Sequence, residues 1–398
     1  MTVRRIRLGM IGGGPGAFIG AVHRIAARLD DQFELVAACV STDPQRASAG
    51  GQALGLPAER SYGTYQDMLS VEQSRSDGIE AVALVTPNSS HYPIARACLE
   101  LGLHVICDKP LTATVEEASQ LAQLVRPNGP LLLLTHTYSG YPLIRHAKAS
   151  IAKGLLGAIR VVNVEYAQGW LSQPIEGGGS KQASWRLDPS RGGPGGCVAD
   201  IGTHAFHLVE FVTGLRISEV AAELTSFGRG RQVPDDAQVL LRFNGGAKGS
   251  LWASQVALGE QNNLVLRVYG DQGSFTWRQE TPDELHFSSL NSPTAIIRRG
   301  DVAAGPEAAA VTRLPAGHPE GYLEAFANLY REAAQAIRAR QEQPPRVLPE
   351  TVVGVQDGLD GMYFVEAVLR SGERNGNWTA LRRAVTNTKT QRSNSSAK

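Results

Sequence analysis

The sequence predicts an α/β protein whose first part is a doubly wound parallel sheet and whose second part contains antiparallel hairpins. A glycine-rich turn follows the first apolar segment, strand-type and helix-type segments alternate as far as residue 139, and longer strands with glycine turns come after it. Because 398 residues are too many for one ordinary core, we expect domains over residues 1–139 and 140–383. The polar segment 384–398 lacks aromatic residues, which predicts a disordered tail.

The composition is globular and shows no strong charge bias. Apolar residues make up 42% of the chain, charged residues 19%, and the formal net charge is +1, which argues against a nucleic-acid or anionic-membrane partner. No segment approaches the roughly 20 consecutive apolar residues of a membrane span. The four cysteines show no CxxC spacing, which is typical of reduced thiols in the cytosol. We expect a cytoplasmic protein.

The first strand, glycine turn and helix form a candidate dinucleotide site. Residues 5–12 are an apolar strand-type segment, and the pattern Gly12-x-Gly14-x-x-Ala17 opens an amphipathic helix. Gly12 permits a tight turn, Gly14 lets a pyrophosphate approach the backbone, and the small Ala17 permits close helix packing. The arginine pair ahead of this segment also resembles an export signal, but cleavage there would remove the first strand.

The end of the second strand, around residue 40, bears on the choice of cofactor. No carboxylate follows it until Asp43, which with Pro44 resembles a helix cap. Ser41, Thr42 and Arg46 could hold a 2′-phosphate. The cofactor is therefore NAD or NADP, with a slight preference for NADP.

Two further segments fall at the carboxyl ends of predicted parallel strands, where such sheets bind ligands. These are residues 86–91, "TPNSSH", and residues 107–110, "CDKP". For Asn88 and His91 we favour contact with the cofactor over simple helix capping by the adjacent serines. The proline after Lys109 favours a fixed turn, cis in some cases, that would aim the lysine. The cofactor-binding candidates are Gly12, Gly14, Pro15, Gly16, Ala17, Ser41, Thr42, Arg46, Thr86, Pro87, Asn88, His91, Asp108 and Lys109.

The second part begins with a predicted helix over 141–157 and a long strand over 158–171. Hairpins with glycine turns are predicted over 235–258 and 263–280. Between the strand and the hairpins lies a polar loop over 169–193, whose aromatic, amide and charged side chains suit a carbohydrate. The alternative is a mobile surface loop anchored by Trp185. The loop residues that suggest carbohydrate binding are Trp170, Glu176, Lys181, Gln182, Trp185 and Arg186, with Gln168 just before them.

The segment after this loop, "GPGGCVADIGTHAFH", would place Asp200, His204 and His207 on one helix face at i, i+4 and i+7. This pattern suits an acid/base site, a metal site or a polar patch. Other histidines could complete a metal site, namely His23, His91, His136 and His318. We expect no metal, because the first third of the chain indicates a nucleotide.

Taken together and in order, these motifs resemble the Gfo/Idh/MocA oxidoreductases. The resemblance rests on the glycine turn, "TPNSSH", "HVICDKPLT", "WRLDP" and "GGCVADIGTHAFHL", and it extends over about residues 6–381. It implies an N-terminal Rossmann domain and a C-terminal α+β domain built on a large open sheet, with the nicotinamide cofactor between them and a sugar or polyol over the nicotinamide. It also implies a homodimer or homotetramer formed through the C-terminal sheet.

The resemblance assigns the catalytic roles. Lys109 matches the lysine of the family's Glu-Lys-Pro motif, and Asp200 and His204 match its Asp-x-x-x-His pair. Histidine suits the base that takes the hydroxyl proton, since its ordinary pKa is about 6.5. Asp200 would orient the substrate, and Lys109 would stabilise the developing alkoxide. The substrate-binding candidates are Tyr138, Gln168, Trp185, Arg186, Asp200 and His204.

Three departures from the family pattern affect substrate identity. The glutamate before the lysine is Asp108, the segment after the last strand of the first sheet is "THTYSGYP", and His207 replaces a third acid. We expect an NAD(P)-dependent oxidoreductase acting on a secondary hydroxyl or ketone of a sugar, sugar derivative or cyclitol. The alternatives are a non-catalytic dinucleotide sensor and a metal-dependent sugar isomerase or hydrolase.

Overall fold

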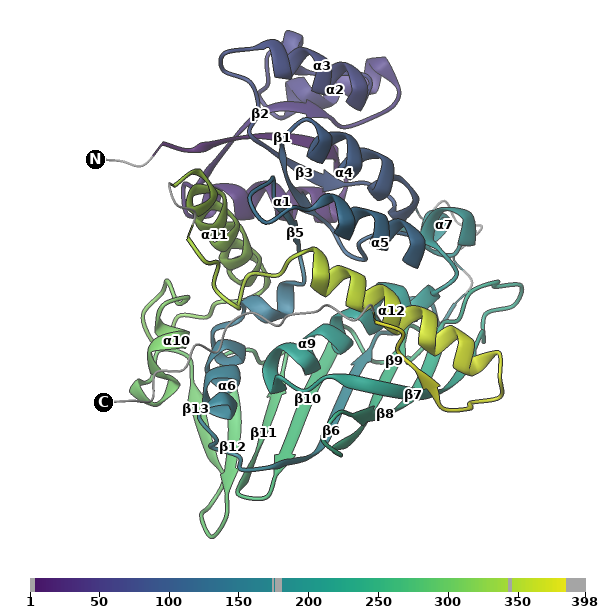
Figure 1. The fold of residues 1–398 in the computed structure, drawn as a ribbon, viewed down its shortest axis with the longest axis vertical. Helices are drawn as coiled ribbons and strands as arrows, with labels where there is room; N and C mark the ends of the chain where they lie inside the picture. The colour runs from purple at the N-terminus through teal and green to yellow at the C-terminus, as the bar shows by residue number, and fades with distance from the viewer. Residues whose placement is uncertain (1–3, 174, 176–180, 343–345, 384–398) are drawn as a thin grey trace, which may run out of the picture.

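The computed structural model of the protein describes residues 4–173, 175, 181–342 and 346–383. The tail predicted over 384–398 lies outside the described residues. A five-stranded sheet forms one end of the molecule and a nine-stranded sheet forms the other, with helix α12 (Val355–Gly372) lying across the junction (Figure 1).

The first sheet is parallel and follows the order β2-β1-β3-β4-β5. All five residues of β3 are buried, as is typical of a strand covered by helices on both faces. Buried apolar clusters lie on each side of the sheet, so the predicted doubly wound arrangement is confirmed. The strands are β1 (Ile6–Gly12), β2 (Phe33–Cys39), β3 (Ala81–Val85), β4 (His104–Cys107) and β5 (Leu132–Leu134).

The helices of this part alternate with its strands, as the sequence predicts. They are α1 (Phe18–Leu29), α2 (Pro44–Ala53), α3 (Tyr65–Ser74), α4 (His91–Glu100) and α5 (Val115–Leu124). A late helix, α11 (Tyr322–Gln341), also packs here: it lies against α1, and its buried residues Phe326 and Tyr330 belong to the core of the first sheet. The core of the first sheet is therefore completed by α11, which begins about 190 residues after β5. Sequence patterns do not reveal a contact between such distant segments.

The second sheet is open and mainly antiparallel, as predicted. Its order is β13-β12-β11-β10-β6-β9-β8-β7-β14, and only the β6–β9 pair is parallel among the described strands. Both predicted hairpins are present, as β8–β9 and β10–β11. The strands are β6 (Ile159–Ala167), β7 (Ile217–Thr225), β8 (Asp236–Phe243), β9 (Lys248–Ser254), β10 (Asn263–Gly270), β11 (Gly273–Arg278), β12 (Glu284–Ser289), β13 (Ala295–Arg298) and β14 (Thr379–Ala380).

One face of the second sheet is covered by helices, and their apolar residues form the largest core. The helix predicted over 141–157 is shorter than expected: α6 (Pro142–Ala152) ends early because Gly154 adopts a positive φ of 83° just after its cap, which stops the helix. The remaining helices are α7 (Lys181–Arg186), α8 (Pro189–Gly192), α9 (Thr203–Thr213) and α10 (Gly305–Ala309). Short 3-10 turns occupy Ala58–Arg60, Asn88–Ser90, Thr137–Gly140 and Val302–Ala304.

The segment containing Asp200 is not the regular helix that the sequence predicts. Val198–Gly202 forms a π-type turn, and α9 begins at Thr203. A π-type turn is wider than an α-helical turn and occurs frequently at functional sites. Asp200 and His207 are therefore not related by the regular spacing that would place them on one stripe.

Candidate active site

The glycine turn after β1 forms a shallow backbone cradle. Gly12 has a positive φ of 81°, and a Cβ there would stand 2.4 Å from the carbonyl oxygen of Val85. A Cβ on Gly14 would stand 2.9 Å from the carbonyl oxygen of Val40. A side chain at either position would clash with the neighbouring strand ends, so the tight turn requires glycine at both.

The closest approach between the turn and α1 occurs at Gly20, which sequence reasoning missed. A Cβ on Gly20 would lie 2.1 Å from the carbonyl oxygen of Gly13. Ala17, to which the sequence assigns close packing, is the N-cap residue of α1 instead. The sequence signal for this close approach was Gly20 itself, a second small residue three positions after Ala17.

The residues after β2 are largely committed to local structure. Asp43 caps α2 by accepting a hydrogen bond from the Arg46 backbone nitrogen at 2.8 Å, which confirms the predicted cap. The Ser41 hydroxyl accepts from the Asp43 nitrogen at 3.1 Å. Thr42 and the Arg46 side chain are exposed.

After β3, the structure gives Asn88 and His91 different roles. The Asn88 side chain donates to the Gly192 carbonyl oxygen at 2.8 Å and so connects this loop to α8 of the second part. The His91 ring is buried, with Nδ1 3.0 Å from the Pro110 oxygen and Nε2 2.8 Å from the Thr86 oxygen. His91 therefore braces the loops that carry Thr86 and Lys109, and it is not among the residues lining the cavity described below.

The loop after β4 fixes Lys109 in place. The Lys109–Pro110 peptide bond is cis, one of the two geometries expected for this turn. The Asp108 carboxylate accepts from the Lys109 backbone nitrogen at 3.0 Å and from the Thr135 hydroxyl at 2.9 Å. Asp108, which replaces the longer glutamate of the family motif, therefore positions the loop through hydrogen bonds to Lys109 and Thr135.

The Asp200 carboxylate is the centre of the site. Its Oδ1 accepts from Lys109 Nζ at 2.9 Å, and its Oδ2 accepts from Arg186 Nε at 3.1 Å and from Gln255 Nε2 at 2.8 Å. Burial raises the pKa of this carboxyl, but the Arg186 and Lys109 charges outweigh burial and hold the pKa well below its usual range. Asp200 is therefore a fixed anion that joins the two halves of the protein. Gln255 follows β9 and could not be recognised from any motif.

His204 lies one helical turn beyond Asp200, in a pocket of aromatic rings. Its ring makes edge contacts with Tyr138 at 4.9 Å and His136 at 5.4 Å between centroids. Burial, followed by the positive charge of Lys109, holds the pKa of His204 well below its ordinary value, so the imidazole is neutral at neutral pH. No described residue hydrogen-bonds its buried Nδ1.

His207 does not join His204 and Asp200. Its ring stacks on His136 at 4.3 Å between centroids with an interplanar angle of 9°. Burial lowers its pKa to about 3, with further lowering by Arg145 and Lys148. His207 therefore supports the wall behind His204.

Lys109, Asp200 and His204 line a cavity of about 910 Å³ between the two parts of the protein. One wall comes from α1, which follows the glycine turn, and the opposite wall comes from the strand ends of the second sheet. The predicted residues that line it are Asp108, Lys109, Tyr138, Gln168, Arg186, Asp200 and His204, and the residues that sequence reasoning missed include Phe18, Thr135, Tyr166, Gln261, Asn262, Gln279 and Tyr322.

The polar loop contributes only part of what the sequence assigns to it. Trp170 lines the cavity with Arg186, whose guanidinium lies 4.2 Å from the centre of the Trp185 ring. Glu176 and the side chains of Lys181 and Gln182 lie outside the described residues. Beside the cavity, Trp185 borders a small hollow together with Asn88 and Gly192.

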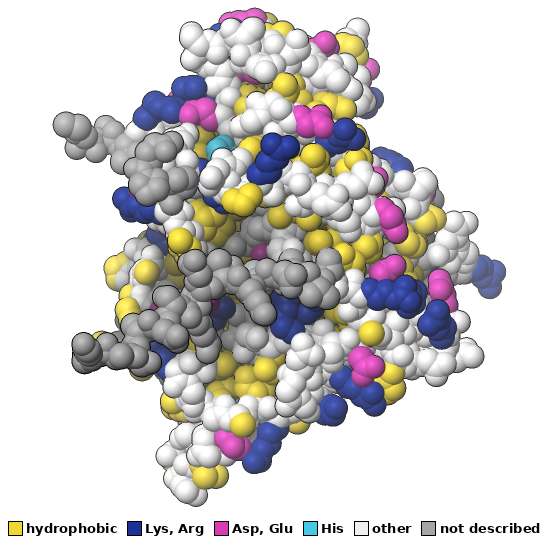
Figure 2. Space-filling view, viewed as in Figure 1, with side chains coloured by type: hydrophobic (Ala, Val, Ile, Leu, Met, Phe, Trp, Pro, Cys, Tyr) yellow, Lys and Arg dark blue, Asp and Glu magenta, His cyan; other side chains and the backbone are white. Residues whose placement is uncertain are grey.

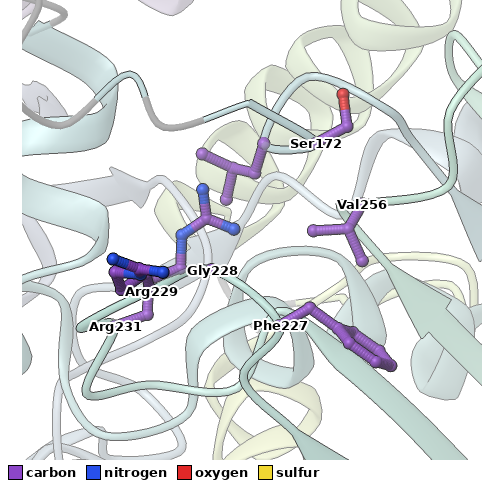
Figure 3. Close-up of a pocket in the computed structure, with 7 residues that line it drawn as sticks. Ser172, Phe227, Gly228, Arg229, Arg231 and Val256 are labelled. Carbon is purple, nitrogen blue, oxygen red and sulfur yellow. The ribbon is translucent and has the colours of Figure 1, made fainter.

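A separate hollow of about 450 Å³ lies between the loops near Ser172, Phe227 and Val256 (Figure 3). Its Arg231 is buried and paired with Asp235 at 2.7 Å, so this charge is compensated within the protein. Within the described ranges, no three or more His, Cys, Asp or Glu side chains cluster closely enough to hold a metal ion. All four cysteines are free and buried.

Lys and Arg side chains are interspersed with Asp and Glu over the face seen in Figure 2. No helix in the part of the chain that the structure describes is both long and apolar enough to span a bilayer.

Comparisons with known proteins agree with this architecture. Two family models match the chain: an oxidoreductase family with an NAD-binding Rossmann fold over residues 6–136, and a GFO/IDH/MocA C-terminal domain over residues 144–276. The uncharacterized oxidoreductase YfiI of Bacillus subtilis is 33% identical over 95% of this chain and 97% of its own length. The levoglucosan dehydrogenase of Pseudarthrobacter phenanthrenivorans is 29% identical over 72% of this chain and 77% of its own.

Among solved structures, an inositol dehydrogenase homolog from Azotobacter vinelandii complexed with NAD⁺ superposes with a TM-score of 0.92. It is 37% identical, and the match covers 95% of this chain and 98% of that one. The same homolog complexed with NADH and myo-inositol gives a TM-score of 0.88 at 36% identity over the same shares of the two chains. The family that the motifs suggested is therefore confirmed: this chain belongs to the Gfo/Idh/MocA oxidoreductases.

Proposed function

We propose that this protein transfers a hydride between a nicotinamide cofactor and a secondary hydroxyl or ketone of a sugar, sugar derivative or cyclitol. The observation that carries the proposal is the convergence of Lys109, Asp200 and His204 on one cavity, whose opposite wall is the helix after the glycine turn. A fixed cation, a fixed anion and a neutral imidazole supply the groups that proton removal from an alcohol needs.

The glycine turn fits a dinucleotide, because a Cβ at position 12 or 14 would clash with the carbonyl oxygen of Val85 or Val40, so the tight turn of the dinucleotide motif needs glycine at both positions. Among the other cofactor candidates, His91 acts by bracing loops and Lys109 acts on the substrate oxygen. The candidates at the glycine turn, after β2 and after β3 keep the cofactor role assigned from the sequence, apart from Asn88. When bound, the nicotinamide supplies the hydride acceptor or donor. Asn88 and Asp108 would hold the loops beside it in position.

The residues of the chain would divide the proton chemistry. His204, neutral at neutral pH, takes the hydroxyl proton during oxidation and returns it during reduction. Lys109 stabilises the negative charge that develops on the substrate oxygen. Asp200 holds Lys109 and Arg186 at fixed positions, so little reorganisation is needed when charge develops.

For the cofactor, the structure favours neither nucleotide strongly. Asp43, the first acid after β2, uses its Oδ1 to cap α2, and this structural role weakens the case that it binds the 2′-hydroxyl of NAD. The exposed Arg46 side chain supports the slight preference for NADP, whereas the solved relative carries NAD⁺. We propose that both nucleotides bind and that Arg46 sets the ratio of their affinities.

We also propose a homodimer or homotetramer formed through the outer face of the second sheet. Apolar side chains are exposed there on separate strands, including Leu240 of β8, which is 56% exposed, and Tyr269 of β10. Light scattering should show an oligomer, and Leu240→Arg should shift it toward monomer.

The function is tested by titrating the purified, metal-free protein with NAD, NADP and their reduced forms in a calorimeter, followed by a polyol screen. The proposal would be supported if the wild type binds a nucleotide and reduces it in the presence of a polyol. In Lys109→Met the reduction should be lost. Nucleotide binding without turnover on any polyol would favour a sensor. Activity that needs zinc or iron and ignores nicotinamide would favour an isomerase or hydrolase.

A further inference from the structure

One wall of the cavity is organised by Asn262, a residue that belongs to none of the recognised motifs. It lies directly before β10, and it is surrounded by side chains from three other segments. Its Oδ1 accepts from Tyr166 Oη and from Gln168 Nε2, both at 2.8 Å. Its Nδ2 donates to Gln279 Oε1 at 3.1 Å and to Tyr138 Oη at 3.3 Å.

These contacts use the full capacity of the amide. A carboxamide oxygen accepts two hydrogen bonds and its nitrogen donates two, and all four are made to the protein. The Tyr138 and Tyr166 hydroxyls are also hydrogen-bonded to each other. The three groups therefore form a closed ring in which Asn262 donates to Tyr138, Tyr138 donates to Tyr166, and Tyr166 donates to Asn262.

The ring determines what the two hydroxyls can offer to a ligand. Each tyrosine has one proton, and the ring consumes both, leaving one free lone pair on each oxygen. If the oxygen and nitrogen of the Asn262 amide were exchanged, the three hydrogen bonds of the ring would run in the opposite direction. Each tyrosine would still donate its proton within the ring and keep one free lone pair. Both tyrosines line the cavity, so their hydroxyls can accept hydrogen bonds from a ligand but cannot donate without breaking the ring.

The same wall is connected to the proposed base. The Tyr138 ring packs against His204 at 4.9 Å between centroids. The Asn262 amide therefore fixes a side chain that is in direct contact with the imidazole. Burial raises the pKa of Tyr138 well above its ordinary value, so its hydroxyl keeps its proton at neutral pH.

We propose that Asn262 is a specificity-determining residue that makes the Tyr138 and Tyr166 hydroxyls acceptor-only, so that this part of the wall selects ligands with free hydroxyl donors. The ligand class is a neutral polyhydroxylated ring. Ligands that present a carboxylate, a phosphate or an ether oxygen to these two hydroxyls would place acceptor against acceptor, and the buried acceptors would then lose their partners. This inference rests on the proposed function, because it takes the ligand of the cavity to be the polyol substrate.

The test uses the full-length protein with bound reduced nicotinamide. A polyol that the wild type oxidises is compared with its monodeoxyfluoro analogues, in which fluorine keeps the size of the hydroxyl but cannot donate. Calorimetry should show at least one ring position where fluorine weakens wild-type binding about tenfold or more. In Asn262→Ala one tyrosine still donates to the other, but the second tyrosine proton becomes free to donate to a ligand, so this ratio should fall toward one and KM should rise.

Asn263→Ala is the matched control, since it removes the neighbouring amide and leaves the ring in place. Tyr166→Phe is the second variant if Asn262→Ala folds poorly, and it should also reduce the ratio. Equal binding of all fluorinated analogues by the wild type, or an unchanged ratio in both variants, overturns the inference alone. A wild type that neither binds nor oxidises any polyol overturns the proposed function and this inference with it.

Discussion

The ammonium of Lys109 lies 2.9 Å from Oδ1 of Asp200, although the two residues are 91 positions apart and lie in different parts of the protein. Both side chains are largely buried, with 12% and 18% of their surfaces exposed. The contact joins the loop after β4 to the π-type turn before α9, so the catalytic candidates are assembled only when the two parts of the protein pack together.

Removing the cation should abolish most of the activity while leaving nucleotide binding nearly intact. For Lys109→Met we expect kcat to fall by about 10²- to 10⁴-fold, because the alkoxide loses its stabilising charge. Steady-state kinetics with a polyol, together with calorimetric titration of the nucleotide, checks this. A kcat within threefold of wild type would show that Lys109 is not part of the chemistry.

The glycine cradle offers a prediction about stability and nucleotide affinity. Gly20→Ala would press a methyl group against the Gly13 carbonyl, so we expect a loss of about 1–3 kcal/mol in the free energy of unfolding and weaker nucleotide binding. Gly63→Ala is the control, since the nearest atoms to its new Cβ lie 3.9 Å away. Similar losses in both variants would contradict the close approach.

The stacked histidines should make stability depend on pH. The pKa of His207 is about 3 in the folded protein and about 6.5 in the unfolded chain. Between these values the unfolded state binds a proton that the folded state does not, so stability falls as pH drops below about 6.5.

His207→Phe removes that proton and should reduce the slope of unfolding free energy against pH by up to about 1.4 kcal/mol per pH unit in this window. Urea denaturation at several pH values measures it. An unchanged slope would mean that His207 titrates normally in the folded state.

The cofactor site yields a selective prediction. Arg46→Ala should weaken NADP binding about tenfold and change NAD binding less than twofold, because only NADP carries the 2′-phosphate. Calorimetric titration of both nucleotides decides it. Equal losses for both would place Arg46 outside the ribose site or show that the substitution disturbs α2.

Much of the first sheet could be predicted because its signals are local. A glycine turn, alternating apolar strands and capped helices each specify structure within some ten residues, and the cap at Asp43 is one example. The candidates Lys109, Asp200 and His204 also lie within short motifs, and the family resemblance that assigns their roles rests on those motifs.

The rest of the site depends on contacts between distant segments. Gln255, Asn262 and Gln279 follow or precede strands of an ordinary antiparallel sheet, and nothing in their neighbourhood distinguishes them until β6, β10 and β11 align. The π-type turn at Val198–Gly202 likewise departs from the regular spacing that the sequence suggests. The packing of α11 on the first sheet is a third feature of this kind.

The most direct measurement follows nicotinamide reduction by absorbance while polyols, including myo-inositol and levoglucosan, are added to wild type and to His204→Asn. The account predicts reduction with at least one neutral polyol and a loss of about 10²-fold or more in kcat for the variant, with nucleotide binding retained. Reduction that is equally fast in His204→Asn, or no reduction by the wild type with any polyol despite bound nucleotide, would contradict it.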